Sequence, residues 1–252
     1  MRSERLINRW VGVGLTQIAV VATIWLSVTG RLTLYIHPRY TVFTTGMAVI
    51  GGIIVSAAIV VASQPRAADD HDHDHDELPS ARTRVLSWSR LAILVLAMVA
   101  LLVVPPATLS STTRQNRELV TSGQALDAPD TRELAGRSTA NFTVKDWAAL
   151  LSYGGPEAVL GEDVDLSGYV LDQGEDDVFF VVRMIVSCCA VDAQPIGVPV
   201  YRPGWRAELE PSTWIALKGT FIENTDQASD QQTVIRVASL SEIDEPDQPY
   251  VF

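Results

Sequence analysis

The sequence predicts an α-helical membrane region followed by a small, mainly β barrel domain. Residues 1–109 contain three long apolar runs, and their nine arginines and seven acidic residues give a formal charge of +2. Residues 110–252 carry ten basic and 23 acidic residues, a formal charge of −13. A domain this acidic repels phosphate backbones, so nucleic-acid binding is excluded as a leading interpretation and cationic partners are favoured.

The three apolar runs have the length of membrane spans. They cover residues 10–29, 41–62 and 88–104, and a helix needs about 17–25 apolar residues to cross a bilayer. The first run follows three arginines, as a signal peptide would. Its length and the second run close behind it favour a retained helix in the lipid bilayer.

Arginine counts predict the orientation of these spans. The N-terminus and the connection between the second and third runs carry more arginine than the first connection. Because basic residues concentrate on the cytoplasmic side, we expect a multi-pass cell-membrane protein with a cytoplasmic N-terminus and an extracytoplasmic C-terminal domain. If residues 88–104 did not span, the acidic domain would be cytoplasmic.

The second connection contains a histidine–aspartate loop, defined here as residues 69–77. Its candidate ligands alternate along the chain: His71, Asp72, His73, Asp74 and His75. Imidazole suits zinc, copper and nickel, and the carboxylates add charge and oxygen ligands. The pattern predicts weak, exchangeable binding of a divalent cation such as zinc in a cytoplasmic loop. A solvated acidic tract is the alternative.

The remaining histidine, His37, lies in the connection between the first two runs. It precedes Pro38, which ends any helix before it and restricts His37 to extended conformations. His37 is a candidate proton or metal ligand close to the membrane. An interfacial turn with a solvated imidazole is the simpler interpretation.

Residues 110–139 form a predicted linker with a short helix near 113–120, and residues 140–252 form the soluble domain. Its first element is a helix, with Thr143 as N-cap and Asp146 as a capping-box partner. Residues 144, 147, 148 and 151 give that helix one apolar stripe. Five strand patterns follow, at residues 164–171, 178–186, 196–201, 214–222 and 233–240.

Five short strands with glycines inside two of them predict an OB-like small barrel. Gly168 and Gly219 are expected at bulges or tight bends. A small sandwich is the alternative architecture.

The segment with the most chemistry in this domain contains Cys188, Cys189 and Asp192, just after the second strand. The cysteines could be small, partly buried packing residues, ligands to zinc together with Asp192, redox-active thiols or a strained vicinal disulfide. Packing is the favoured interpretation and metal binding the second. The domain contains no histidine, so a fourth metal ligand and any Cys–His or Ser–His catalytic pair are missing from it.

Several of these pieces together resemble the YcgQ-like family of permease-associated bacterial membrane proteins. The matching pieces are residues 35–38, the histidine–aspartate loop, residues 187–193, residues 214–221 with Lys218 and Gly219, and the tail near Pro249 and Tyr250. The resemblance implies a membrane subunit that works beside a large, multi-span YcgR-like permease. It also connects loosely with zinc homeostasis.

From these observations we expect an accessory membrane subunit of a permease complex, linked to zinc or another divalent metal, and no enzymatic activity. Three apolar spans offer too few polar groups to form a transport path alone. The alternative is a membrane-anchored thiol redox protein that uses Cys188 and Cys189. That alternative lacks the Cys-x-x-Cys motif typical of such proteins.

Overall fold

The computed structural model describes residues 2–63, 96, 99, 119, 138–226 and 228–252. The chain divides into two compact units. The first comprises Met1–Thr33 with Pro38–Pro106, and the second Leu34–His37 with Ala107–Phe252. A short piece of the connection between the first two helices therefore belongs to the second unit.

The first unit contains two long helices, α1 (Arg2–Val28) and α2 (Thr41–Ser63). The 3-10 turns Arg31–Leu34 and Pro38–Tyr40 lie between them in the chain. At about 1.5 Å per residue, α2 matches a hydrocarbon core about 30 Å thick. Its sequence carries no charged residue, so its whole length is compatible with lipid.

Polar contacts join the two helices. The Gln17 side-chain nitrogen donates to the Gly52 carbonyl at 3.3 Å and to the Ser56 hydroxyl at 3.0 Å. The hydroxyls of Ser27 and Thr45 lie 2.7 Å apart. Small and hydroxyl-bearing residues commonly mediate helix contacts in membranes because they allow close approach and satisfy polar groups.

The structure supports one of the three predicted spans by length and composition. Among the described residues, the helical stretch Pro38–Val61 is long and apolar enough to cross a membrane, with a mean hydropathy of 2.2. The first helix contributes a shorter apolar stretch, Gly12–Val28. Apart from positions 96 and 99, the third predicted span at 88–104 lies outside the described residues.

The second unit begins, after the 3-10 turn Thr139–Asn141, with α6 (Val144–Ala149). The predicted capping box is confirmed, because Thr143 donates its backbone N–H to the Asp146 carboxylate at 2.8 Å and its hydroxyl caps the Asp146 N–H at 3.4 Å. Trp147 is fully buried and packs on Phe142 and Phe221. A π-helical turn, Leu150–Gly154, and a 3-10 turn, Pro156–Ala158, lead into the sheet.

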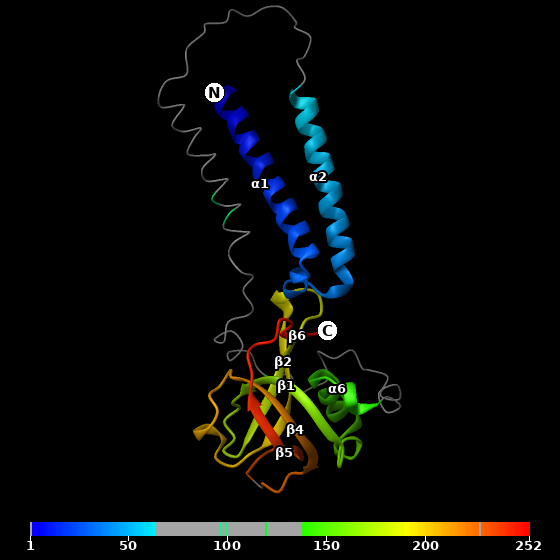
Figure 1. Cartoon of the computed structure of the whole chain (residues 1–252), viewed down its shortest axis with the longest axis vertical. Helices are drawn as coiled ribbons and strands as arrows, with labels where there is room; N and C mark the ends of the chain where they lie inside the picture. Colours follow the sequence, from blue (N-terminus) through cyan, green and yellow to red (C-terminus); the bar gives the residue numbers. More distant parts are fainter. Residues whose placement is uncertain (1, 64–95, 97–98, 100–118, 120–137, 227) are drawn as a thin grey trace, which may run out of the picture. The chain divides into compact units, whose positions relative to one another are not determined.

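Five strands close into a mixed barrel, as the sequence predicts (Figure 1). They are β1 (Asp163–Leu171), β2 (Val178–Ile185), β3 (Gln194–Tyr201), β4 (Trp214–Glu223) and β5 (Thr233–Glu242). Their order is β1-β4-β5-β3-β2, and pairing of β1 with β2 closes the ring. Within the five-stranded ring, only β3 and β5 pair in parallel. The sequence did not predict the 3-10 turn Trp205–Ala207 or a sixth strand, β6 (Tyr250–Val251), which pairs in parallel with β2 at Met184 and Ile185.

The two strand glycines allow close backbone approach. A register shift between Lys218 and Gly219 confirms the predicted bulge, and a Cβ on Gly219 would lie 2.5 Å from the Arg236 carbonyl oxygen. Gly168 is in an unbroken ladder instead of a bulge. A Cβ there would lie 2.6 Å from the Val182 carbonyl oxygen, so tight strand crossing is the reason for this glycine.

The barrel has apolar packing on both faces of β2. Alternate residues such as Phe179 and Val181 fill the interior with Trp147 and Trp205. The intervening residues Phe180, Val182 and Met184 belong to a second cluster outside the barrel, with Leu34, Tyr250 and Phe252 among its other members. Because both faces of β2 are covered, its sequence is a nearly continuous apolar run and does not alternate between apolar and polar residues.

Candidate metal site

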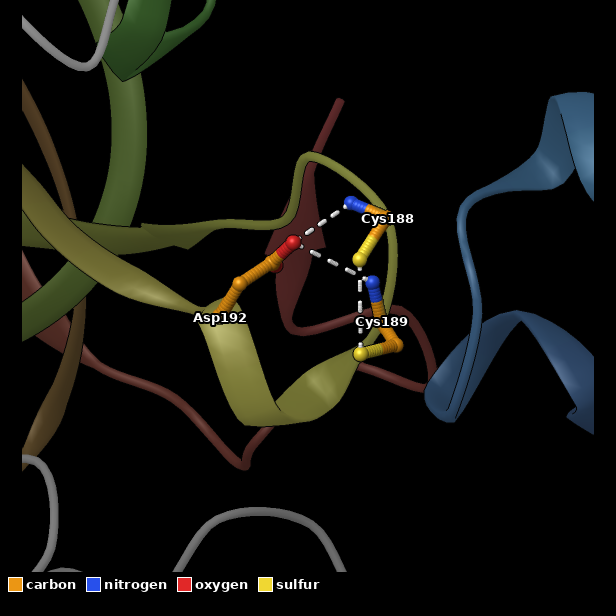
Figure 2. Close-up of side chains that lie close together, drawn as sticks. All are labelled: Cys188, Cys189 and Asp192. Carbon is orange, nitrogen blue, oxygen red and sulfur yellow. Dashed lines mark hydrogen bonds between the residues drawn. The ribbon is translucent and has the colours of Figure 1, made fainter.

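The connection from β2 to β3 carries the two cysteines. We call residues 187–192 the cysteine loop; it ends in the 3-10 turn Ala190–Asp192, after which β3 begins. Figure 2 shows the side chains of Cys188, Cys189 and Asp192 turned toward one another across this loop. The structure therefore brings together the three residues of the predicted site in the barrel domain.

Asp192 holds the loop in this shape. Its carboxylate accepts backbone N–H groups from Ser187 at 3.2 Å, from Cys188 at 2.7 Å and from Cys189 at 3.4 Å. The Asp192 N–H in turn donates to the Cys189 carbonyl at 3.0 Å. A carboxylate that accepts several N–H groups fixes a tight turn, so the positions of both thiols are set by the fold.

The two thiols are free and lie side by side. The Cys188 Sγ lies 3.5 Å from the Cys189 Sγ, which is a hydrogen-bonding distance and not a disulfide. Cys188 is exposed and Cys189 is half-buried. The interpretation of both cysteines as partly buried packing residues does not fit Cys188, which is exposed, whereas Cys189 remains compatible with it.

The local charges oppose ionisation of Cys188. Hydrogen bonds to the Asp192 carboxylate and to the Cys189 sulfur raise the pKa of the Cys188 thiol to about 12. Burial raises the pKa of Asp192, but hydrogen bonds from the Cys188 thiol and from three backbone N–H groups outweigh it and leave this pKa below its usual value. At neutral pH the loop holds a carboxylate beside a protonated thiol.

The donor set fits a soft or borderline divalent cation. The two sulfurs and a carboxylate oxygen of Asp192 all lie within 4.8 Å of one another. In tetrahedral zinc sites, with Zn–S near 2.3 Å and Zn–O near 2.1 Å, ligand atoms lie about 3.6–3.8 Å apart. Side-chain rotations alone could bring these three atoms onto one ion, with a fourth position left open.

A piece of the connection between α1 and α2 pairs with the cysteine loop. Ile36 and Cys189 form an antiparallel bridge. On either side of it, the His37 N–H donates to the Cys188 carbonyl at 3.0 Å and the Ala190 N–H donates to the Tyr35 carbonyl at 2.8 Å. This pairing was not predicted, because nothing in either segment's composition reveals a partner so distant in sequence.

The remaining predicted metal ligands belong to the histidine–aspartate loop. The histidine–aspartate loop, with His71, Asp72, His73, Asp74 and His75, lies outside the described residues, as does almost all of the predicted linker and its short helix. The proposal for that loop continues to depend on its sequence alone.

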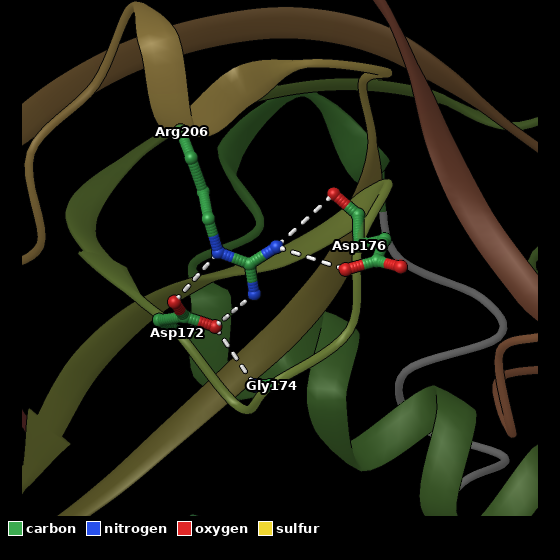
Figure 3. Close-up of polar contacts among 4 residues, drawn as sticks. All are labelled: Asp172, Gly174, Asp176 and Arg206. Carbon is green, nitrogen blue, oxygen red and sulfur yellow. Dashed lines mark hydrogen bonds and ion pairs between the residues drawn. The ribbon is translucent and has the colours of Figure 1, made fainter.

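A second aspartate at the other end of the barrel is held by an arginine (Figure 3). The Arg206 guanidinium donates to both oxygens of Asp172, at 2.9 and 2.7 Å, and lies 3.6 Å from an Asp176 oxygen. The Gly174 N–H also donates to Asp172 at 2.8 Å. The hydrogen bond from Arg206 is the main cause that lowers the pKa of Asp172.

The barrel unit also has a cleft of about 260 Å³ between α6 and the sheet. Its lining includes Ser152, Pro199, Asp230, Gln232 and Thr233. No cysteine or histidine is among the described residues that line it.

Comparisons with known proteins identify the family of this chain. Residues 17–119 match the family model of the DUF1980 N-terminal domain, and residues 130–252 match that of the DUF1980 C-terminal domain. Among solved structures, the chain is similar to the OBody AM3L09 bound to hen egg-white lysozyme, with 23% identity, 34% of this chain and 84% of that chain covered, and a TM-score of 0.23. The strand order β1-β4-β5-β3-β2, closed by pairing of β1 with β2, is what makes the barrel OB-like. None of the curated proteins matches.

Proposed function

For a chain that carries the N-terminal and C-terminal domains of DUF1980, we propose a membrane-anchored accessory protein that binds a divalent cation such as zinc at its cysteine loop. The observation that carries the proposal is the convergence of Cys188, Cys189 and Asp192, whose ligand atoms lie within 4.8 Å of one another. The backbone pre-forms this arrangement, because Asp192 accepts three N–H groups of the same loop. Binding would therefore require little reordering.

Metal binding fits the loop better than redox catalysis. A redox-active cysteine needs a thiolate near neutral pH, whereas the pKa of Cys188 is raised to about 12. The negative charge of Asp192 opposes a thiolate but attracts a cation. When a cation arrives, it replaces the thiol protons and brings the two sulfurs and the carboxylate to one centre.

The exposure of the site determines how readily a bound cation would exchange. Cys188 is exposed and the loop supplies only three ligands. A structural zinc site is normally closed by four protein ligands. A solvent-facing site that must also release protons favours exchangeable binding, as delivery or sensing requires.

The helices supply the membrane anchor in this proposal. The α2 sequence has no charged residue, and the side chain of Gln17 in α1 is used in hydrogen bonds to α2. Such a pair of helices suits anchoring and docking instead of forming a polar path. We propose that a separate multi-span permease forms the path. In this proposal residues 88–104 form a third span, which leaves the N-terminus and the histidine–aspartate loop in the cytoplasm and the barrel outside.

Zinc binding by the full-length protein in detergent tests the cation proposal. The measurement uses a chain in which His71, His73 and His75 are replaced by alanine, so that only the cysteine loop is measured. Titration against a competing chelator should show one zinc per chain, and Cys188→Ser or Cys189→Ser should weaken binding at least tenfold. Asp244→Asn, at an exposed carboxylate of the same unit, serves as the control. Equal zinc binding by the Cys188→Ser chain would refute the proposal.

Association with a permease needs its own experiment. The full-length chain, carrying an affinity tag, is purified from membranes with and without a zinc chelator, and co-purified proteins are identified by mass spectrometry. We expect a multi-span transporter in stoichiometric amount. Recovery of the chain alone under both conditions, from membranes cross-linked before extraction, would contradict the accessory-subunit proposal.

A further inference from the structure

We propose that His37 is a fourth ligand of the cysteine site, so that zinc would be held by two sulfurs, one carboxylate oxygen and one imidazole nitrogen. This inference depends on the proposed cation binding at the cysteine loop. His37 lies far from the cysteines in sequence, in the connection between α1 and α2, yet it belongs to the same compact unit as the barrel.

The backbone register places His37 opposite Cys188. Ile36 pairs with Cys189, and the hydrogen bonds on either side extend the ladder by one residue in each direction. In an antiparallel pair, residues directly across from each other have Cβ atoms about 4.5–5.5 Å apart and side chains on the same face. His37 and Cys188 therefore start within reach of a common ligand.

Local sequence stabilises this register. Pro38 disfavours the helical region for His37 and leaves it extended, which is the conformation a β-bridge requires. The hydrogen bond from the His37 N–H to the Cys188 carbonyl, at 3.0 Å, then fixes the distance between the two backbones. The imidazole is carried on a backbone that is already positioned.

The ring itself lies against the C-terminus. The His37 and Phe252 ring centroids are 5.1 Å apart with an interplanar angle of 73°. The imidazole nitrogens are not in the group of ligand atoms within 4.8 Å of one another. We expect zinc binding to rotate the ring from Phe252 toward the sulfurs, a change in side-chain torsions without a change in backbone register.

His37 would supply the ligand that the barrel domain lacks. Residues 140–252 contain no histidine, and the cysteine loop alone leaves a tetrahedral ion one ligand short. Four protein ligands of sulfur, nitrogen and oxygen type satisfy zinc's preference for tetrahedral coordination. In that arrangement a residue between the two helices becomes a direct ligand, so that the cation would bind the helical connection as well as the barrel.

The test compares His37→Phe with Phe252→Ala in the full-length chain that lacks the three loop histidines. His37→Phe keeps an aromatic ring for contact with Phe252 but removes the nitrogen ligand. It should weaken zinc binding about 10- to 100-fold and abolish the imidazole scattering in the zinc X-ray absorption spectrum. Phe252→Ala removes the ring contact but keeps the ligand, so binding and the imidazole signal should persist.

Two other outcomes distinguish the role of His37 from the proposed cation binding at the cysteine loop. If the parent chain binds zinc through the cysteines and His37→Phe binds equally well without a change in the spectrum, the fourth-ligand assignment is refuted and the cysteine site stands. If the parent chain binds no zinc at all, the cation proposal fails and the role of His37 fails with it.

Discussion

Two loops of the barrel unit are each shaped by one aspartate, and the two differ in what balances the charge. Asp172 accepts the Gly174 N–H and is paired with Arg206, whose guanidinium reaches both carboxylate oxygens. Asp192 accepts three backbone N–H groups, and no lysine or arginine among the described residues forms an ion pair with it. Backbone donors hold Asp192 in place but leave its net charge uncompensated beside two thiols.

The comparison separates a structural carboxylate from a candidate ligand. Both aspartates have a lowered pKa, so lowered pKa alone does not distinguish them. The difference lies in the partner: a guanidinium occupies both oxygens of Asp172 and excludes another cation. Asp192 keeps a full negative charge for a cation that the neighbouring sulfurs can also coordinate.

The largest expected effect concerns the reactivity of Cys188. Asp192→Asn removes the carboxylate that raises the pKa of this thiol to about 12, so the pKa should fall toward its ordinary value of 9.0. Because the thiolate is the nucleophile, alkylation at pH 8 should accelerate on the order of 100-fold. Iodoacetamide labelling with site-resolved mass spectrometry measures the rate. Asp172→Asn should leave the alkylation rate unchanged. Equal rates in the two variants would show that the Asp192 carboxylate does not control the reactivity of Cys188.

Zinc affinity should depend steeply on pH. The Cys188 thiol, whose pKa is raised to about 12, must release its proton when it binds a metal, so the affinity should rise at least about tenfold between pH 6 and pH 7. Chelator competition at each pH, in the chain without the loop histidines, gives the slope. A slope near zero would show that the thiols are not the ligands.

Charge at Asp192 should matter more to zinc than charge at Asp172. Asn at position 192 can still accept the Cys188 and Cys189 N–H groups through its single side-chain oxygen, but it loses the second acceptor, which serves the Ser187 N–H, and the negative charge. We expect about tenfold weaker binding in Asp192→Asn and no change in Asp172→Asn. Isothermal titration of the two variants side by side checks this, and equal losses would show that overall acidity, not the local ligand, sets the affinity.

Much of the barrel was predictable because local patterns determine it. All five predicted strands appear within a few residues of their expected ends, and the Thr143–Asp146 capping box follows from spacing alone. The short β6 was missed because two residues carry no periodicity. Gly168 was expected at a bulge or tight bend; the ladder there has no bulge, and a close approach of strands makes the same demand for glycine.

The site was only half predictable for a related reason. Cys188, Cys189 and Asp192 are neighbours in sequence, so their convergence follows from one tight turn. Two other features are long-range in sequence: the packing of Leu34 and Phe252 in the cluster outside the barrel, and the bridge from Ile36 to Cys189. No local sequence pattern predicts either of them.

The smallest expected effect is on stability, and it tests the structural role of Asp172. Its pKa is lowered in the folded state, so the stabilisation from the Arg206 pair is fully present above the ordinary aspartate pKa of about 3.9 and is lost as pH falls through the lower folded value. Exposed ion pairs contribute little, so Asp172→Asn should lower the thermal midpoint of the full-length protein by a few degrees at most at pH 7. Near-UV circular dichroism, which follows the buried tryptophans, measures the midpoint. The gap between variant and parent should close at acidic pH, and a gap that widens there would show that Asp172 stabilises the fold by some means other than its charge.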